Sequence, residues 1–207
     1  AIASRYHRAG ASGIYTFNWH ANRDSKRLLL TTIGAPETLA TQDKIYAATH
    51  RFIQREGAWR GAFRIDRIYG QVPVDLERTL TGEGPTITLD VADDFGAHKP
   101  TLVQLRLRIN EWTHGDAVRV WWDGQALDSP EIDYCRLSNP TPPGGAFQPL
   151  PHWRDIAEVS SAVWLSWDLS EAVLSTGEHA VRIAVQERNP QVGVALTLTD
   201  VELVVRY

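Results

Sequence analysis

Hydrophobic and polar residues alternate along most of the chain beyond residue 63, with the period of two that is typical of strands with one buried face. The clearest run is 101–112, and the pattern repeats in 86–95, 117–127, 162–170, 178–188 and 192–207. In the clearest run the apolar and polar positions separate completely: Val103, Leu105, Leu107 and Ile109 against Gln104, Arg106 and Arg108. Several antiparallel strands of this kind, without alternating helices, predict a mostly β fold with two sheets packed as a sandwich.

The same alternation predicts which tryptophans face the core and which face solvent. It points Trp122 and Trp167 inward and Trp121 and Trp164 outward. The dipeptide Asp123-Gly124 lies between two short runs and predicts a tight hairpin. The outward tryptophans share their strands with arginines, and such a face suits either a sugar platform or docking against a neighbouring domain.

The first 62 residues have a different pattern. Residues 13–19 have high strand propensity, residues 25–34 resemble a helix that ends at Gly34, and a further helix is expected within 36–53. The sequence therefore predicts a short α/β appendage before the sandwich, with the division at residues 62 and 63.

A long irregular stretch, 129–161, interrupts the strands and is rich in Pro, Gly, Asn and Ser. Within it we expect Tyr134 and Trp153 to offer flat rings for stacking, and Asp133, Arg136 and Asp155 to read sugar hydroxyls. The alternative is a loop that wraps the edge of the sandwich with Trp153 as its hydrophobic anchor.

Composition restricts the function classes. The net charge of −4 provides no basic field for nucleic acid, and no apolar run approaches the ~20 residues that span a bilayer. We therefore expect neither nucleic acid nor a membrane as a partner. Cys135 is the only cysteine, so an intrachain disulfide is impossible and the count does not identify the compartment. Because the chain lacks methionine, we expect it to be a processed or excised piece of a longer protein.

Metal and nucleophile signals are weak. The histidines form no HxH or HxxxH pair, and GxSxG, P-loop and GxGxxG motifs are absent. Hard oxygen ligands for a structural calcium ion could come from Asp93, Asp94 and Asp200, whereas exposed acids at strand ends are commonly just solvated. No other cofactor is expected.

"GASGIYTFNWH" (10–20) and "IGAPETLATQDKIY" (33–46) resemble the last strand and helix of a (β/α)₈-barrel glycoside hydrolase. The resemblance implies that Trp19, at the end of that strand, lines a sugar site in a parent enzyme. Alternatively, Trp19 packs against the sandwich. The carboxylates of such barrels lie on earlier strands, so the resemblance implies no glycosidase activity for this chain alone.

"VRVWWDGQAL" (118–127), "STGEHAVRIAV" (175–185) and "ALTLTDVELVVRY" (195–207) resemble a galactose-binding-like jelly roll, the fold of many carbohydrate-binding modules. The two resemblances imply a non-catalytic carbohydrate-binding or accessory sandwich of a polysaccharide-degrading enzyme. Its partners would be a polysaccharide or oligosaccharide and the catalytic barrel of the parent chain, with an extracytoplasmic (secreted or periplasmic) bacterial location as the expectation. The alternatives are a fragment that completes the active site of a barrel and a purely structural interaction domain.

Overall fold

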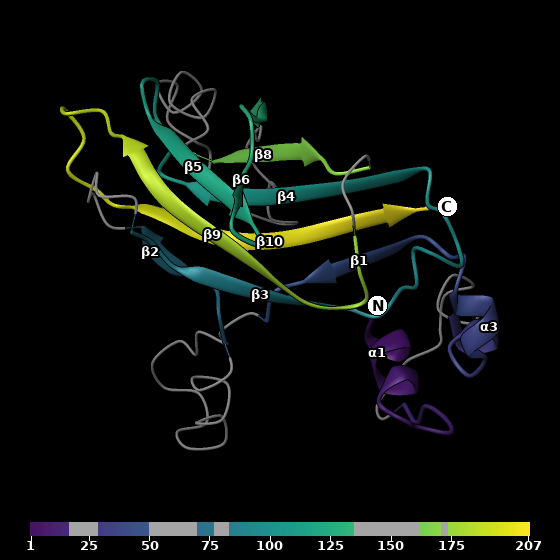
Figure 1. Ribbon diagram of the computed structural model, residues 1–207. Helices are drawn as coiled ribbons and strands as arrows, with labels where there is room; N and C mark the ends of the chain where they lie inside the picture. The colour runs from purple at the N-terminus through teal and green to yellow at the C-terminus, as the bar shows by residue number, and fades with distance from the viewer. Residues whose placement is uncertain (17–28, 50–69, 77–82, 135–161, 171–173) are drawn as a thin grey trace, which may run out of the picture.

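The computed structural model describes residues 1–16, 29–49, 70–76, 83–134, 162–170 and 174–207 (Figure 1). Its strands form two antiparallel sheets. The six-stranded sheet has the order β1-β10-β4-β8-β7, with β2 also pairing with β10. Its strands are β1 (Lys44–Ala47), β2 (Val74–Leu76), β4 (Leu102–Asn110), β7 (Glu131–Tyr134), β8 (Val163–Asp168) and β10 (Leu196–Arg206).

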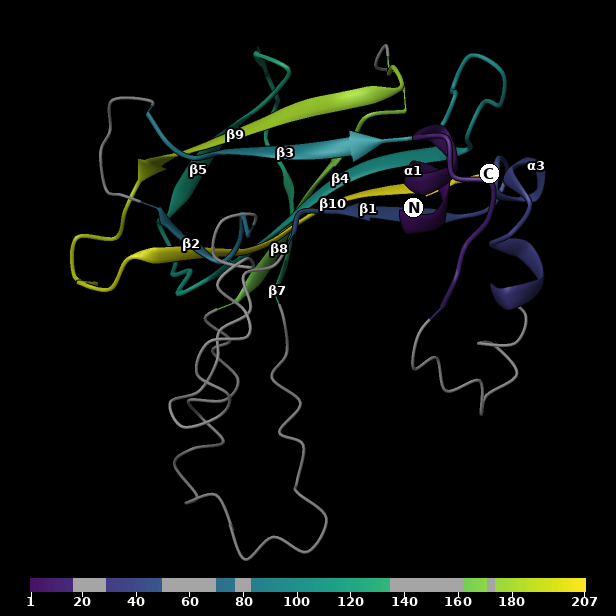
Figure 2. The same cartoon turned by 90° about the horizontal axis from the view of Figure 1, so that it is seen from below.

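The four-stranded sheet has the order β3-β9-β5-β6. Its strands are β3 (Thr86–Val91), β5 (Ala117–Trp122), β6 (Gln125–Ala126) and β9 (Gly177–Glu187). Figure 2 shows the two sheets as separate layers, with β3, β5 and β9 facing β1, β4 and β10. The predicted mostly β, two-sheet sandwich is therefore confirmed.

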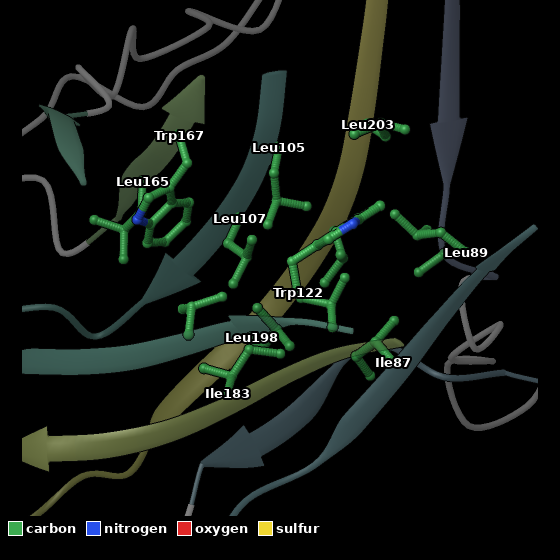
Figure 3. Close-up of a cluster of buried hydrophobic side chains, with 14 of the residues drawn as sticks. Ile87, Leu89, Leu105, Leu107, Trp122, Leu165, Trp167, Ile183, Leu198 and Leu203 are labelled. Carbon is green, nitrogen blue, oxygen red and sulfur yellow. The ribbon is translucent and has the colours of Figure 1, made fainter. Parts of the chain in front are cut away.

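The core lies between the layers and consists of the inward rows that the alternation predicted. Figure 3 shows side chains from both sheets meeting there, among them Leu105, Leu107 and Leu203 from the larger sheet and Ile87, Leu89 and Ile183 from the smaller one. All six are almost completely buried. Burying apolar surface stabilises a fold by roughly 25 cal/mol per Å², so these rows supply most of the driving force for packing the sheets.

A bulge in β10 changes which residues face the core. Leu198 lies opposite Ile109 and Asp200 lies opposite Arg108, so Thr199 is an extra residue without a counterpart on β4. The buried positions consequently shift from even to odd numbers: Leu196 and Leu198 before the bulge, Val201, Leu203 and Val205 after it. Without that shift, the second half of the strand would present its apolar residues to solvent.

The N-terminal region corrects two expectations. Residues 13–16, the described part of the predicted strand 13–19, form neither helix nor strand. In residues 36–49, the described part of the predicted helix 36–53, only α3 (Pro36–Leu39) is helical, because β1 (Lys44–Ala47) pairs antiparallel with β10. Pairing places Tyr46 in the core and leaves Ile45 exposed, a period-two arrangement that a helix cannot satisfy.

Other short helical segments are α1 (Ile2–Arg8) and residues 29–32. The predicted division at residues 62 and 63 lies outside the described residues, and it stays a prediction. No helix in the described ranges is long and apolar enough to cross a membrane.

Two ion pairs are buried at opposite ends of the sandwich. The first joins Arg188, just after β9, to Asp116, just before β5, with side chains 5% and 0% exposed. Burial opposes ionisation of Asp116, but hydrogen bonds from the Asn189 N–H, the Arg188 guanidinium and Thr113 outweigh it and hold the pKa of that carboxyl below its usual value. Asp116 therefore stays ionised and fastens the ends of two neighbouring strands together.

Replacing Asp116 by asparagine should lower the free energy of unfolding by about 3–5 kcal/mol, because the buried Arg188 guanidinium loses its counter-charge. Urea unfolding at pH 7 measures this loss, with the exposed Glu178→Gln as the matched control. The wild-type advantage should also vanish as the pH falls through the lowered pKa of Asp116, since protonation removes the same charge. A D116N variant as stable as E178Q would show that the pair contributes nothing.

The second buried pair joins Lys44 Nζ to Asp93 Oδ1 at 3.0 Å, with side chains 2% and 3% exposed. The Lys44 ammonium also donates to the Gln42 carbonyl at 2.9 Å and lies 4.9 Å from the centre of the Tyr207 ring. Burial, together with the negative charge of Asp93, raises the pKa of Tyr46 and of Tyr207 above the usual value of 10.0. Both phenols are therefore held in their neutral form beside the pair.

A raised pKa in the folded state gives stability that is complete below pH 10 and is lost as the pH rises beyond it. We therefore expect the free energy of unfolding to fall steeply above pH 10 and to fall less steeply in Tyr46→Phe. Urea midpoints from pH 8 to 11.5, with phenolate absorbance followed in parallel, measure both quantities. Tyr15→Phe, at a residue 89% exposed, is the control and should leave the slope unchanged. An unchanged slope in Y46F would contradict the assignment.

Candidate functional site

The hairpin between β5 and β6 is fixed by its turn residues. Asp123 and Gly124 both have positive φ, 49° and 84°, as the predicted tight hairpin requires. The Asp123 carboxylate accepts a hydrogen bond from the Ala180 N–H at 2.8 Å, and its second oxygen lies 2.7 Å from Nδ1 of the buried His179. The His179 ring stacks on Trp122 with a centroid separation of 4.7 Å. The hairpin is thus tied to β9 and has a defined position.

After β6 the chain crosses from the smaller sheet to the larger one along residues 127–130. Trp167 of β8 holds this crossing segment in place, because its Nε1 donates to the Asp128 carbonyl at 2.8 Å while its ring lies in the core. A buried indole N–H normally needs such a partner. The crossing segment therefore forms a defined wall at the edge where β6 and β7 lie.

A hollow of about 690 Å³ opens on one side of the crossing segment, and we call it the edge cleft. Its lining includes the inward tryptophans of β5 and β8, Trp122 and Trp167. Its polar lining combines amides, carboxylates and a hydroxyl: Gln104, Gln125, Asp128, Glu131, Ser166 and Asp168. No Lys, Arg or His side chain is among the described residues that line it, so the edge cleft is rich in hydrogen-bond acceptors and carries negative charge.

Asp168 is the best-defined carboxylate of the edge cleft. Hydrogen bonds from the Ser170 hydroxyl and the Ser170 N–H lower the pKa of Asp168, and the Ser170 hydroxyl oxygen in turn accepts from the Val103 N–H at 3.0 Å. Asp168 lies directly opposite Gln104 on β4. The strand register therefore places an ionised acceptor beside an amide that both donates and accepts.

A second hollow of about 460 Å³ lies on the other side of the crossing segment. It shares Leu127, Asp128 and Ser129 with the edge cleft and adds Trp112 and Ile132. Tyr134, 55% exposed, ends β7 two residues after Ile132 and points to the same side of the sheet. Tyr134 therefore lies on the same strand as Glu131 of the edge cleft, three residues or about 10 Å further along β7.

The predicted outward tryptophans are outward in the structure. Trp121 and Trp164 are both partly exposed, but arginines cover their rings: Arg182 lies 3.6 Å and Arg119 5.7 Å from the centre of Trp121, and Arg106 lies 4.8 Å from the centre of Trp164. Neither tryptophan therefore presents two bare faces to a sugar ring.

The residues predicted from the long insert are only partly described. Asp133 and Tyr134 lie on β7, opposite Trp164 and Val163 respectively. Successive residues of a strand point to opposite faces, so Asp133 joins Trp164 on the outer face and Tyr134 joins the inner row. The structure thus separates a ring and an acid that we expected in one site. Arg136, Trp153, Asp155 and Trp19 lie outside the described residues and stay predictions.

The three predicted calcium ligands have other partners. Asp93 pairs with Lys44, Asp94 accepts from the Gly96 and Ala97 N–H groups, and Asp200 lies 3.8 Å from Arg108 on the larger sheet. Lys44 lies opposite Val205, five residues along β10 from Asp200, which places Asp200 about 17 Å along the strand from that pair. Among the residues described here, no three acids, histidines or cysteines form a metal-binding group.

Comparison with known protein families finds no matching family model, and no curated protein sequence matches the chain. The edge cleft was also not predicted from the sequence. Its polar residues come from separate strands and the crossing segment, so no local sequence pattern could have indicated it.

Trp167→Phe should test the wall of the edge cleft. The substitution keeps an aromatic ring in the core but removes the hydrogen bond to the Asp128 carbonyl, so we expect a loss of about 1 kcal/mol in the free energy of unfolding, plus a small cavity cost. Amide hydrogen exchange should accelerate selectively in residues 127–131, whereas exchange in β4 and β10 should change only with global stability. Unchanged exchange in the crossing segment would show that Trp167 does not position it.

Proposed function

We propose that this protein is a non-catalytic carbohydrate-binding or accessory β-sandwich of a polysaccharide-degrading enzyme, with the edge cleft as its sugar-binding site. The observation that carries the proposal is the lining of the edge cleft, which combines two amides and several carboxylates with two tryptophans. Sugar hydroxyls both donate and accept, so planar amides and carboxylates match them, while aromatic and apolar groups match the C–H faces of the ring.

Size and placement also support a saccharide. A hollow of about 690 Å³ lies in the range of small-molecule sites, roughly 300–1,000 Å³. It is open at the edge of the sandwich, so a chain longer than one sugar could continue along the crossing segment toward the second hollow and Tyr134.

A bracing role is the second candidate, and the arginine-covered tryptophans favour it. The Arg106 guanidinium lies over the Trp164 ring and donates to the Glu202 carboxylate at 2.5 Å. This part of the outer face therefore contains an arginine that contacts both an aromatic ring and an acid. Such a surface suits contact with a neighbouring domain, for which the catalytic barrel of a parent chain is our candidate. In that case the edge cleft would bind no sugar.

Affinity gel electrophoresis on neutral plant, algal and microbial polysaccharides separates the two candidates. The double variant Gln104→Ala/Gln125→Ala removes both amides of the edge cleft and should weaken retention about thirtyfold, from the loss of two neutral hydrogen bonds of about 1 kcal/mol each. Gln191→Ala, at an exposed turn residue, is the matched control and should leave retention unchanged. We also expect Trp153→Ala to weaken retention more than Trp121→Ala.

The double variant and Trp153→Ala need circular dichroism spectra and unfolding curves that match those of wild type. This control is needed because Trp153 could instead anchor its loop. Equal retention of wild type and the double variant would remove the edge cleft as the site. If none of these neutral polysaccharides retards the wild-type protein, the edge cleft is not a binding site for neutral sugars, and the bracing role becomes the favoured candidate.

A further inference from the structure

Both ring nitrogens of the buried His179, on β9, face hydrogen-bond acceptors. Nδ1 lies 2.7 Å from the Asp123 carboxylate, and Nε2 lies 2.8 Å from the Ser175 carbonyl oxygen. A neutral imidazole has one N–H, so it donates to one of these oxygens and turns a lone pair toward the other. The two distances together therefore indicate that the ring is doubly protonated and carries a positive charge.

The surroundings of His179 favour that charge. The Asp123 carboxylate supplies the counter-charge, and the Trp122 ring stacks on the imidazole with centroids 4.7 Å apart and 21° between the planes. A cation over an aromatic face is attracted to the ring. Loss of one proton leaves an acceptor facing a lone pair in a buried position, which costs the energy of an unmade hydrogen bond. The contacts on both sides of the ring are therefore complete only while His179 is charged.

Asp123 is the titratable side chain that contacts His179 among the residues that the structure describes. From the neighbouring strand β3, the apolar Leu89 lies opposite His179. Asp90 lies opposite Glu178, one position along both strands and therefore on the other face of the sheet. The immediate partners of the imidazole are thus one acid, one carbonyl and apolar or aromatic side chains.

The next charged groups have partners of their own. Asp93, beyond the end of β3, is paired with Lys44 in the interior. Asp168, which lines the edge cleft together with Trp122, has a pKa held below its usual value by Ser170. Histidine side chains ordinarily titrate near neutral pH, whereas carboxyl groups do so near pH 4. A range that begins at about pH 5.5 therefore follows imidazole rather than carboxylate titration.

The charged imidazole positions one wall of the edge cleft. Trp122, which stacks on it, lines the edge cleft, and Gln125 follows the tight turn into the same lining. The Asp123 carboxylate also accepts from the Ala180 N–H at 2.8 Å, so two contacts attach the turn to β9. Release of the His179 contact leaves one of them and frees the face of the Trp122 ring that the imidazole covers.

We propose that His179 is a positioning residue of the edge cleft, and that its charge limits sugar binding there to acidic and neutral pH. The inference rests on the proposed carbohydrate-binding function and adds its regulation by pH. The protonated ring holds the hairpin against β9, so affinity is complete at low pH and is lost as the pH rises and the ring loses a proton. A neutral saccharide has no group that titrates in this range, so the dependence comes from the protein.

Affinity gel electrophoresis between about pH 5.5 and 9 measures the dependence, with hydroxyethyl cellulose, xyloglucan and galactomannan as neutral polysaccharides. Mobility at each pH is compared with that in a gel without polysaccharide, since the charge of the protein also changes. We expect affinity to fall about tenfold across the range, the scale of one charge-assisted hydrogen bond. Affinity that does not change with pH would overturn the proposal.

Asp123→Asn is the variant that tests the charge. Asn-Gly is as well suited to a tight hairpin as Asp-Gly, so the variant should fold, but it removes the counter-charge of the imidazole. The midpoint of the pH profile should therefore move to lower pH by about one unit, a tenfold change in proton binding. His114→Gln, at an exposed histidine, is the matched control and should leave the profile unchanged. A midpoint that is the same in D123N and wild type would contradict the role of the pair.

Nitrogen-15 NMR tests the positioning without any sugar. At about pH 5.5 both ring nitrogens of His179 should carry protons, and the indole resonance of Trp122 should shift with the same midpoint as the ring. His179→Gln and Trp122→Phe assign the two signals, and D123N replaces H179Q as the test if H179Q does not fold. A singly protonated ring at pH 5.5, or an indole signal that ignores the His179 titration, overturns the inference. If none of the three polysaccharides binds, the proposed function and the pH limit on binding fail together, whereas the indole signal still decides whether His179 positions Trp122.

Discussion

The fold depends on burying the inward rows of two sheets against each other. Val103, Leu105, Leu107 and Ile109 on β4 are completely buried, and β10 and β9 supply matching rows. Because a strand points alternate residues to opposite faces, fixing the inner row also fixes the outer one. The outward positions of Trp121 and Trp164 follow from that constraint, and the bulge at Thr199 keeps β10 in phase with it.

Local alternation was sufficient to predict the long strands β3, β4, β5, β8, β9 and β10, and it also predicted the buried face of β4 and the inward tryptophans of β5 and β8. It failed for β1, where the four residues Lys44–Ala47 are too few to show a period and depend on β10 for pairing. The buried ion pairs of Lys44 with Asp93 and of Asp116 with Arg188 also could not be predicted from the sequence, because each joins residues that are far apart in the chain.

The candidate sites were likewise predicted only in part from the sequence. Sequence alternation predicted which tryptophans face outward, but the arginines that cover them lie partly on other strands, so their stacking is a property of strand register. The edge cleft combines residues from β4, β5, β6, β7, β8 and the crossing segment, and no local pattern joins them. Asp133 and Tyr134 were grouped by proximity in the sequence, whereas a strand necessarily separates neighbours onto opposite faces.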